Sequence, residues 1–164
     1  MNTINRSALF VALSAVAFAG QIQAQTATDD FQVTAEVVAA CSIVAGDLAF
    51  GNYNPVTAAA VPGQSTINVT CTNASPYTIG LSAGAGASVT ARVMTHSGGP
   101  ETLTYGLFID ALFAQNWGTD LADRLADTGT GVNQAHTVYG RVDAGQNLAI
   151  AGVYTDTVTA TIYF

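Results

Sequence analysis

Apolar and polar residues alternate one for one along several short stretches of this chain. Residues 31–37 read FQVTAEV, and residues 66–71 repeat the pattern with isoleucine, valine and cysteine as the apolar members. A period of two places successive side chains on opposite faces of a strand, so that one face can be buried and the other exposed. Since no long stretch has helical periodicity, the chain is predicted to be all-β.

The other segments with strand character are short and closely spaced. They are residues 41–44, 48–51, 77–81, 89–94, 103–109, 137–142 and 153–164. Residues 58–63 are expected to form a loop, and residues 119–127 to form about two helical turns with Thr119 or Asp120 as the N-cap. This series of elements predicts an antiparallel β-sandwich with Greek-key connections.

The two end segments of the pattern are unusual. The last one, residues 153–164, has a face that is apolar except for Asp156. That face carries Tyr154, Asp156, Val158, Ala160, Ile162 and Phe164. Because the chain stops on this strand, we expect one edge of the sandwich core to be uncovered. Near the other end, Phe31, Val33, Ala35 and Val37 form an apolar comb, which is either the domain's own first strand or a strand offered to another molecule.

The first 24 residues have the organisation of a secretory signal peptide. Arg6 lies in a short charged region, residues 8–20 are apolar, and Ala24 is a small residue at the expected cleavage site. The apolar run is shorter than the ~20 residues that a membrane-spanning helix needs. We therefore expect export, and no later segment is apolar enough to span a bilayer as a helix.

The two cysteines, Cys41 and Cys71, both remain after this cleavage. An exported chain with an even number of cysteines usually pairs them, so a disulfide is predicted. In the chain-entropy model, closing a loop of this length stabilises the fold by about 3.5–4 kcal/mol. Neither His96 nor His136 stands at ligand spacing to a cysteine, so no metal site is predicted.

Composition excludes several classes of function. Hydrophobic residues make up 49% of the chain, which argues against disorder. The net charge of −7 excludes a basic face for nucleic acid. Asp127, Thr128 and Gly129 form a single triplet that is typical of a turn, and neither a phosphate loop nor a serine nucleophile elbow is present. No catalytic residue, no cofactor and no enzymatic activity are predicted.

A series of short motifs in a fixed order runs through nearly the whole exported chain. After Cys41 the motifs are LAFGNY (48–53), INVTC (67–71), PY (76–77), RVM (92–94), LTYGLF (103–108), NWG (116–118), GTG (129–131), VYGR (138–141) and AGVYTDTV (151–158). In the order and spacing of these motifs, the chain resembles the spore coat U domain family, which is found in subunits of archaic (Csu-type) chaperone–usher pili.

The resemblance implies an incomplete immunoglobulin-like (pilin) antiparallel β-sandwich over residues 39–164, completed by a donor strand. Residues 25–38 are the implied N-terminal donor-strand segment, whose apolar comb completes a neighbouring subunit. The implied acceptor and chaperone-binding residues lie on the last strand. They are Tyr154, Val158, Ala160, Ile162 and Phe164.

The resemblance also implies a function and partners. The chain would be a structural subunit of a secreted adhesive pilus, acting in cell adhesion and biofilm formation, and assembled by chaperone–usher donor-strand exchange. Its partners would be identical or related subunits in a head-to-tail polymer, a periplasmic chaperone and an outer-membrane usher. It would pass through the periplasm to the cell surface.

Two alternative interpretations remain open from the sequence. A small outer-membrane β-barrel also combines a signal peptide, alternating strands and a terminal phenylalanine, but it needs strands of about 9–11 residues and two aromatic girdles. A secreted carbohydrate-binding β-sandwich is the other. A pilus subunit predicts a detergent-resistant polymer, a barrel predicts a heat-modifiable membrane monomer, and a carbohydrate-binding domain predicts a monomer that folds without a chaperone.

Overall fold

The computed structural model describes residues 23–164 and divides the chain into two units, Met1–Ala35 and Glu36–Phe164. Residues 1–22, which are most of the expected signal peptide, lie outside the described residues. Residues 23–35 belong to no helix or strand, and their side chains are exposed. The strand expected over residues 31–37 is not formed, because an extended segment becomes a strand only when it has a ladder partner.

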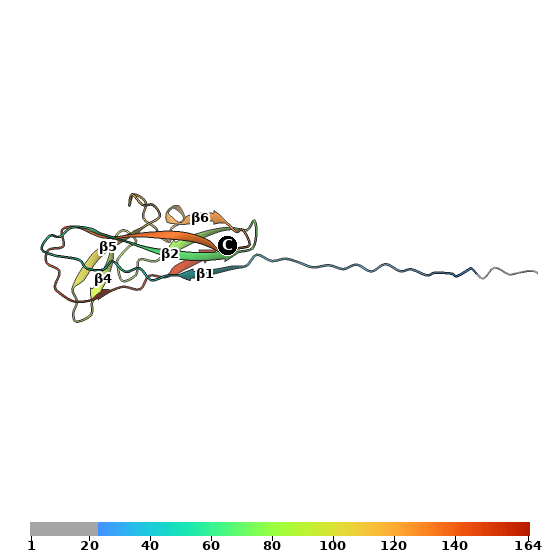
Figure 1. The fold of residues 1–164 in the computed structure, drawn as a ribbon, viewed down its shortest axis with the longest axis horizontal. Helices are drawn as coiled ribbons and strands as arrows, with labels where there is room; N and C mark the ends of the chain where they lie inside the picture. The colour runs from blue at the N-terminus through green and yellow to red at the C-terminus, as the bar shows by residue number, and fades with distance from the viewer. Residues whose placement is uncertain (1–22) are drawn as a thin grey trace, which may run out of the picture. The chain divides into compact units, whose positions relative to one another are not determined.

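Residues 23–164 contain nine β-strands in two antiparallel sheets (Figure 1). The strands are β1 (Cys41–Ala45), β2 (Val61–Cys71), β3 (Pro76–Leu81), β4 (Arg92–His96), β5 (Thr102–Phe108), β6 (Leu125–Thr128), β7 (Gln134–Val142), β8 (Tyr154–Thr155) and β9 (Ala160–Tyr163). The larger sheet has the order β1-β2-β7-β5-β4-β8, and the smaller has the order β6-β3-β9. The prediction of an all-β antiparallel fold is confirmed. Within the described residues, no helix has the length and apolar character to cross a bilayer.

The core lies between the two sheets and follows the alternation of the sequence. On β2, the buried apolar residues are Ile67, Val69 and Cys71, which are spaced two apart. Trp117 is fully buried, and its indole N–H donates to the carbonyl of Ile79 on β3 at 2.8 Å. Its backbone N–H donates to the carbonyl of Leu107 on β5 at 2.9 Å. Trp117 therefore ties the smaller sheet to the larger one.

Two predicted elements differ in the structure, and in both cases the reason is pairing with a strand that is distant in the sequence. The loop expected over residues 58–63 is partly strand, because the first residues of β2 continue its ladder with β7. The helix expected over residues 119–127 is one 3-10 turn, η1 (Leu121–Asp123), followed by β6. Leu125 pairs with Ile79 on β3 and packs against the core. Pairing and burial outweigh a helical pattern too short to be stable alone.

The final segment is two short strands rather than the one long strand expected. β8 pairs with β4 in the larger sheet and β9 pairs with β3 in the smaller, so residues 156–159 cross from one sheet to the other. The alternation continues through the crossing. Every second residue from Tyr154 to Ile162 is half-buried, whereas Val153, Thr155, Thr157 and Thr159 are exposed. The predicted faces are therefore found from Val153 to Ala160, although the predicted strand is broken, whereas Thr161 is half-buried and Phe164 is exposed.

Candidate functional site

An open groove of about 510 Å³ reaches into the core of the sandwich. One wall consists of residues 45–48 and Phe50, which begin at the end of β1. The other wall consists of residues 154–158 and Ala160, between β8 and the start of β9. The floor is formed by apolar side chains of both sheets. They are Ile67, Leu81, Met94, Tyr105, Leu107 and Val138. The groove is thus a gap in the side of the sandwich that leads to the largely buried apolar side chains of the core.

Leu48 and Phe50 hold the first wall against the larger sheet. Their side chains lie over Gly63 of β2 and Gly140 of β7, and a Cβ atom on Gly140 would lie 2.8 Å from Leu48 Cδ1. Phe50 also meets the ring of Tyr105 edge-on, with ring centroids 5.9 Å apart. The sequence predicts a strand over residues 48–51, but no ladder of the described residues includes them. Residues 48–50 of this wall therefore have alternating side chains and a backbone outside the ladders, whereas Ala45 and Gly46 are still bonded to β2.

Asp156 is the one acidic residue that the sequence places on the apolar face of the second wall. Its carboxylate accepts a hydrogen bond from the Tyr105 hydroxyl at 2.6 Å and from the backbone N–H groups of Ala85 and Thr157 at 2.8 and 2.7 Å. Burial and the bond to Asp156 raise the pKa of Tyr105, so its hydroxyl stays a donor. Asp156 therefore fastens the crossing segment to β5 and to the loop after β3.

Three strands beside the groove have an edge without a ladder neighbour within the part of the chain that the structure describes. β1 and β8 are the two end strands of the larger sheet, and β9 is an end strand of the smaller one. Of these, β1 and β9 lie close to each other without being paired. An unpaired edge presents a row of backbone N–H and C=O groups that can bond to an added strand. The groove is thus apolar at its floor and has backbone donors and acceptors at its sides.

The predicted acceptor residues lie in three places. Tyr154, Val158 and Ala160 line the groove together. Ile162 is half-buried and packs against the core. Phe164 is 62% exposed and lies at a separate shallow hollow on the smaller sheet. The structure therefore brings together the first three of these residues at one site.

The predicted donor residues have their side chains in solvent. Phe31, Val33 and Val37 are 87%, 81% and 86% exposed, and Ala35 is exposed as well. Burial of a large apolar side chain is worth about 1.5–3 kcal/mol relative to leaving it in water. A comb of exposed apolar side chains on an unpaired segment is therefore a strong candidate for binding an apolar groove.

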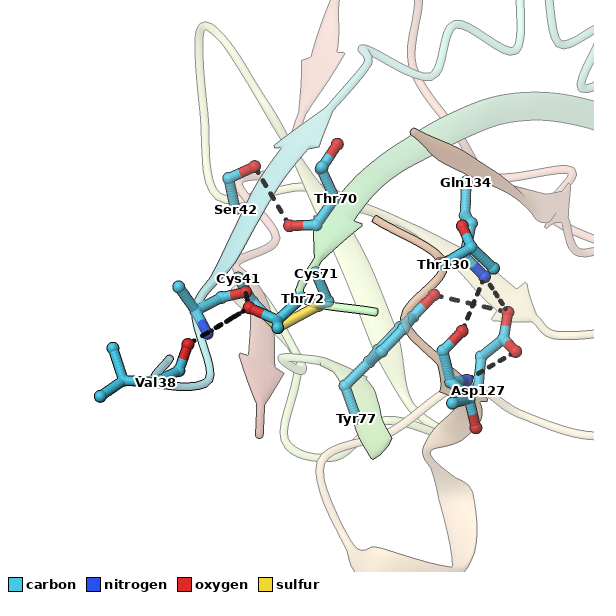
Figure 2. Close-up of a disulfide and its surroundings, with 12 residues drawn as sticks. Val38, Cys41, Ser42, Thr70, Cys71, Thr72, Tyr77, Asp127, Thr130 and Gln134 are labelled. Carbon is cyan, nitrogen blue, oxygen red and sulfur yellow. Dashed lines mark hydrogen bonds between the residues drawn. A yellow bond between two sulfur atoms is a disulfide. The ribbon is translucent and has the colours of Figure 1, made fainter. Parts of the chain in front are cut away.

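The disulfide between Cys41 and Cys71 is present, as predicted (Figure 2). It joins the first residue of β1 to the last residue of β2, which stand opposite each other in the ladder. One residue further on, the Thr72 N–H donates to the Ala40 carbonyl at 2.9 Å, and the Ala40 N–H donates to Thr72 Oγ1 at 3.0 Å. The pairing of the two chain segments thus continues on the N-terminal side of β1, past Cys41.

A polar cluster links the two sheets near the disulfide, and Figure 2 shows part of it. His136 Nε2 lies 2.8 Å from the Tyr77 hydroxyl and 3.7 Å from a carboxylate oxygen of Asp127. Burial lowers the pKa of His136, which Asp127 partly opposes. Burial, together with Asp127, raises the pKa of Tyr77 to about 12. None of these residues lines the groove, and residues 23–164 hold no group of three potential metal ligands.

Arg92 is a buried residue whose role the sequence does not predict. Its guanidinium donates to the backbone carbonyls of Ser82, Val89, Leu81 and Trp117 at 3.0, 2.8, 3.2 and 2.6 Å. These bonds hold the loop between β3 and β4, whose Ala85 also binds Asp156. Burial lowers the pKa of Arg92, but an arginine remains charged in proteins. Its place in the RVM motif is the signal that could have singled it out.

Comparison with known proteins identifies relatives over the whole chain. A family model described as Spore Coat Protein U domain matches residues 27–161. Protein U of Myxococcus xanthus is 36% identical over 181 residues, and the match covers 100% of both chains.

A solved structure shares the fold. A chain in the crystal structure of a chaperone–tip adhesion subunit pre-assembly complex, from the archaic chaperone–usher Csu pili of Acinetobacter baumannii, matches with a TM-score of 0.57 at 24% identity. The match covers 78% of this chain and 40% of that chain, so this chain spans less than half of its structural neighbour. The family model and the full-length relative show that the chain belongs to the Spore Coat Protein U domain family.

Proposed function

We propose that this chain is a structural subunit of a secreted adhesive pilus, assembled through a chaperone–usher pathway by donor-strand exchange. The observation that carries the proposal is the open groove, which leads to the apolar core between the unpaired edges of β1 and β9. In the proposed fibre, residues 25–38 of one subunit fill the groove of the next. The proposal gives the chain a structural role in surface adhesion and biofilm formation and no enzymatic one.

Strand addition suits both the chemistry and the shape of the groove. Added backbone bonds contribute about 0.5–1.5 kcal/mol each, and they form regardless of sequence. Burial of the comb supplies the remaining binding free energy, since Phe31, Val33 and Val37 each bring a large apolar side chain. Ala35 brings a small one. Apolar burial and backbone pairing together would give the contact its stability.

The same geometry produces a fibre. Donor segment and groove are different surfaces of one chain, so the contact is heterologous and does not close on itself. Each subunit would offer a free donor segment at one end and a free groove at the other. Growth is then head to tail, and the structural neighbour's origin in archaic chaperone–usher pili supports this mode of assembly.

The groove also explains the need for a chaperone. A subunit released before it meets its neighbour keeps an apolar groove open and the apolar side chains of its comb in solvent, and exposed apolar surface promotes aggregation. A periplasmic chaperone that lends a strand to β9 and to the wall at Tyr154, Val158 and Ala160 would cover them. An outer-membrane usher would then exchange that strand for the next subunit's donor segment. The solved neighbour comes from a chaperone–subunit complex, which supports this step.

The test uses charged substitutions on the comb. We expect Phe31→Asp with Val33→Asp to abolish detergent-resistant polymer when the chain is produced with its chaperone, because a carboxylate cannot be buried unpaired in an apolar groove. The matched control is Gln32→Asp with Thr34→Asp, which adds the same charge to the alternate face of the same segment and should leave the polymer intact. Unchanged polymer yield from the comb variant would sink the donor assignment.

A further inference from the structure

The proposed function raises a question of competition within one chain. The comb ends at Val37, and only residues 38–40 separate it from Cys41 at the start of β1. A segment tethered this closely has an effective concentration in the millimolar range if its linker allows it to reach. A donor segment that reached its own groove would therefore outcompete the segment of any neighbour. Polymerisation needs a feature that excludes this intramolecular reaction.

Length alone does not exclude it. Loops of two to five residues commonly reverse the chain in a β-hairpin, and residues 38–40 form a stretch of that size. A reversal there would lay residues 31–37 antiparallel to β1, along the edge that has no ladder neighbour among the described residues. That edge leads into the first wall of the groove, which starts at Ala45. The short link is thus long enough for self-insertion.

Thr72 holds the link in the opposite conformation (Figure 2). The Thr72 N–H donates to the Ala40 carbonyl at 2.9 Å, and Thr72 Oγ1 accepts the Ala40 N–H at 3.0 Å. The threonine hydroxyl has the carbonyl oxygens of Ala40 and Val38 as acceptors at 3.3 and 3.5 Å. The side chain thereby extends the β1–β2 ladder past Cys41, and residues 38–40 leave the domain in line with β1. A hairpin needs new backbone angles at residues 38–40, so it competes with these bonds.

The disulfide makes this exit rigid. Ala40 and Thr72 are the direct neighbours of Cys41 and Cys71, which stand opposite each other in the ladder and are covalently joined. The two bonding segments therefore cannot drift apart while the disulfide is intact. Thr72 is thus kept within hydrogen-bonding distance of Ala40.

The residue types of the link point the same way. Tight hairpin turns require positive φ angles, which glycine, asparagine and aspartate adopt and β-branched residues avoid. Residues 37–40 read VVAA, without a glycine, asparagine, aspartate or proline. The segment is therefore a poor turn former, independently of what Thr72 binds.

We infer that Thr72 and the turn-resistant link act as an exit guide, which keeps the donor segment out of its own groove and reserves it for a second copy of this chain. The inference rests on the proposed function. The bonds of Thr72 fix the direction in which the chain leaves β1, and residues 37–40 oppose its reversal. Because the segment cannot turn back to its own groove, donor-strand exchange takes place between two molecules.

The experiment removes the guide in the full chain, co-produced with its chaperone. The variant combines Val38→Asn and Ala39→Gly, which introduce a turn sequence, with Thr72→Val, which removes the hydroxyl and keeps the shape. We expect a folded monomer whose share does not change with protein concentration, and whose residues 31–37 are protected from hydrogen exchange. Because the tether would again act at high effective concentration, the monomer share should rise by about tenfold or more.

Two matched controls place the same changes elsewhere. Thr70→Val alters an exposed threonine two residues earlier on β2, and Thr26→Asn with Ala27→Gly places the turn sequence before the comb. Both should polymerise like the parent chain. The double variant Val38→Asn with Ala39→Gly, tested without the Thr72 change, should give an intermediate monomer share and covers the case in which Thr72→Val fails to fold.

The outcomes separate the inference from the proposed function. If the guide variants keep the parent's monomer share, or if parent monomers already protect residues 31–37, the exit guide is wrong while donor-strand exchange stands. If the parent is a stable monomer that is unaffected by deletion of residues 25–37, no strand is missing. In that case the proposed function fails and the inference fails with it.

Discussion

At the scale of single residues, His136 is a group whose pKa the fold shifts by burial. It lies on β7 between Tyr77 of β3 and Asp127 of β6, so it stands between the two sheets. Its pKa is lowered chiefly by burial, with Asp127 acting in the opposite direction. The folded chain thus favours the neutral imidazole, which can share a hydrogen bond with the Tyr77 hydroxyl without introducing a second charge.

This predicts a loss of stability in mild acid. A histidine with a lowered pKa in the folded state takes up its proton first in the unfolded chain, so stability rises with pH through that window. The free energy of unfolding should be full above the ordinary histidine pKa of 6.5 and decline as the pH falls below it. Guanidinium unfolding between pH 7.5 and pH 5 measures the decline.

The variant His136→Gln should flatten this pH dependence. The matched control is His96→Gln, at the chain's other histidine on β4, which should keep the decline. A pH profile that is unchanged in the His136 variant would contradict the assignment.

At the scale of elements, the last segment changes sheets at a point fixed by Asp156. The carboxylate is bonded to a core tyrosine, to the loop after β3 and to its own following residue. Nothing in the alternation of residues 153–164 marks this crossing, because its cause lies in partners far away in the sequence. Periodicity therefore predicted the inward side chains from Tyr154 to Ile162, but it missed where the strand breaks and that Phe164 is exposed.

The hydroxyl of Tyr105 should carry a measurable part of this anchoring. Tyr105→Phe removes a hydrogen bond to the half-buried carboxylate of Asp156 and should lower the free energy of unfolding by about 1.5–3 kcal/mol. Tyr139→Phe on β7 is the control, since its hydroxyl makes no hydrogen bond among the described residues, and it should cost little. Denaturant titration of both variants compares the losses, and equal losses would show that the bond to Asp156 contributes nothing of its own.

In other elements too, the local sequence pattern predicts some features, whereas others depend on contacts with distant parts of the chain. The alternation over residues 48–50 predicts the inward side chains of Leu48 and Phe50, whereas the absence of a ladder there depends on the open groove. The short helical pattern near Leu121 is real but gives way to β6, since β3 offers a pairing edge. The buried position of Arg92 was the hardest to predict, because the four carbonyl groups that it binds come from three separate segments of the chain.

At the scale of the whole molecule, one covalent bond stabilises a domain that has a groove beside its core. The disulfide closes the connection from β1 to β2, which contains the first wall of the groove. The pairing was predictable from the expected export and the even cysteine count. Its position at the exit of the proposed donor segment was not, because that depends on the register of β1 and β2.

Removing this bond should cost much of the stability of the domain. Cys41→Ser with Cys71→Ser should lower the free energy of unfolding by about 3.5–4 kcal/mol, the chain-entropy value for a loop of this length. Reduction of the parent chain with dithiothreitol should reproduce the loss, which thermal and denaturant unfolding would both report. An unchanged unfolding midpoint in the variant would mean that the loop is equally constrained without the bond.

Trp117 gives this molecule an optical reporter at a useful position. It is the chain's single tryptophan, fully buried and bonded to both sheets. Its fluorescence therefore reports on one contact alone, with emission at short wavelength when the sheets are closed and at longer wavelength when water reaches the indole. Because Trp117 does not line the groove, filling the groove leaves the emission wavelength unchanged while the sandwich stays closed. Folding of a subunit and its addition to a fibre can thus be timed separately in one unlabelled sample.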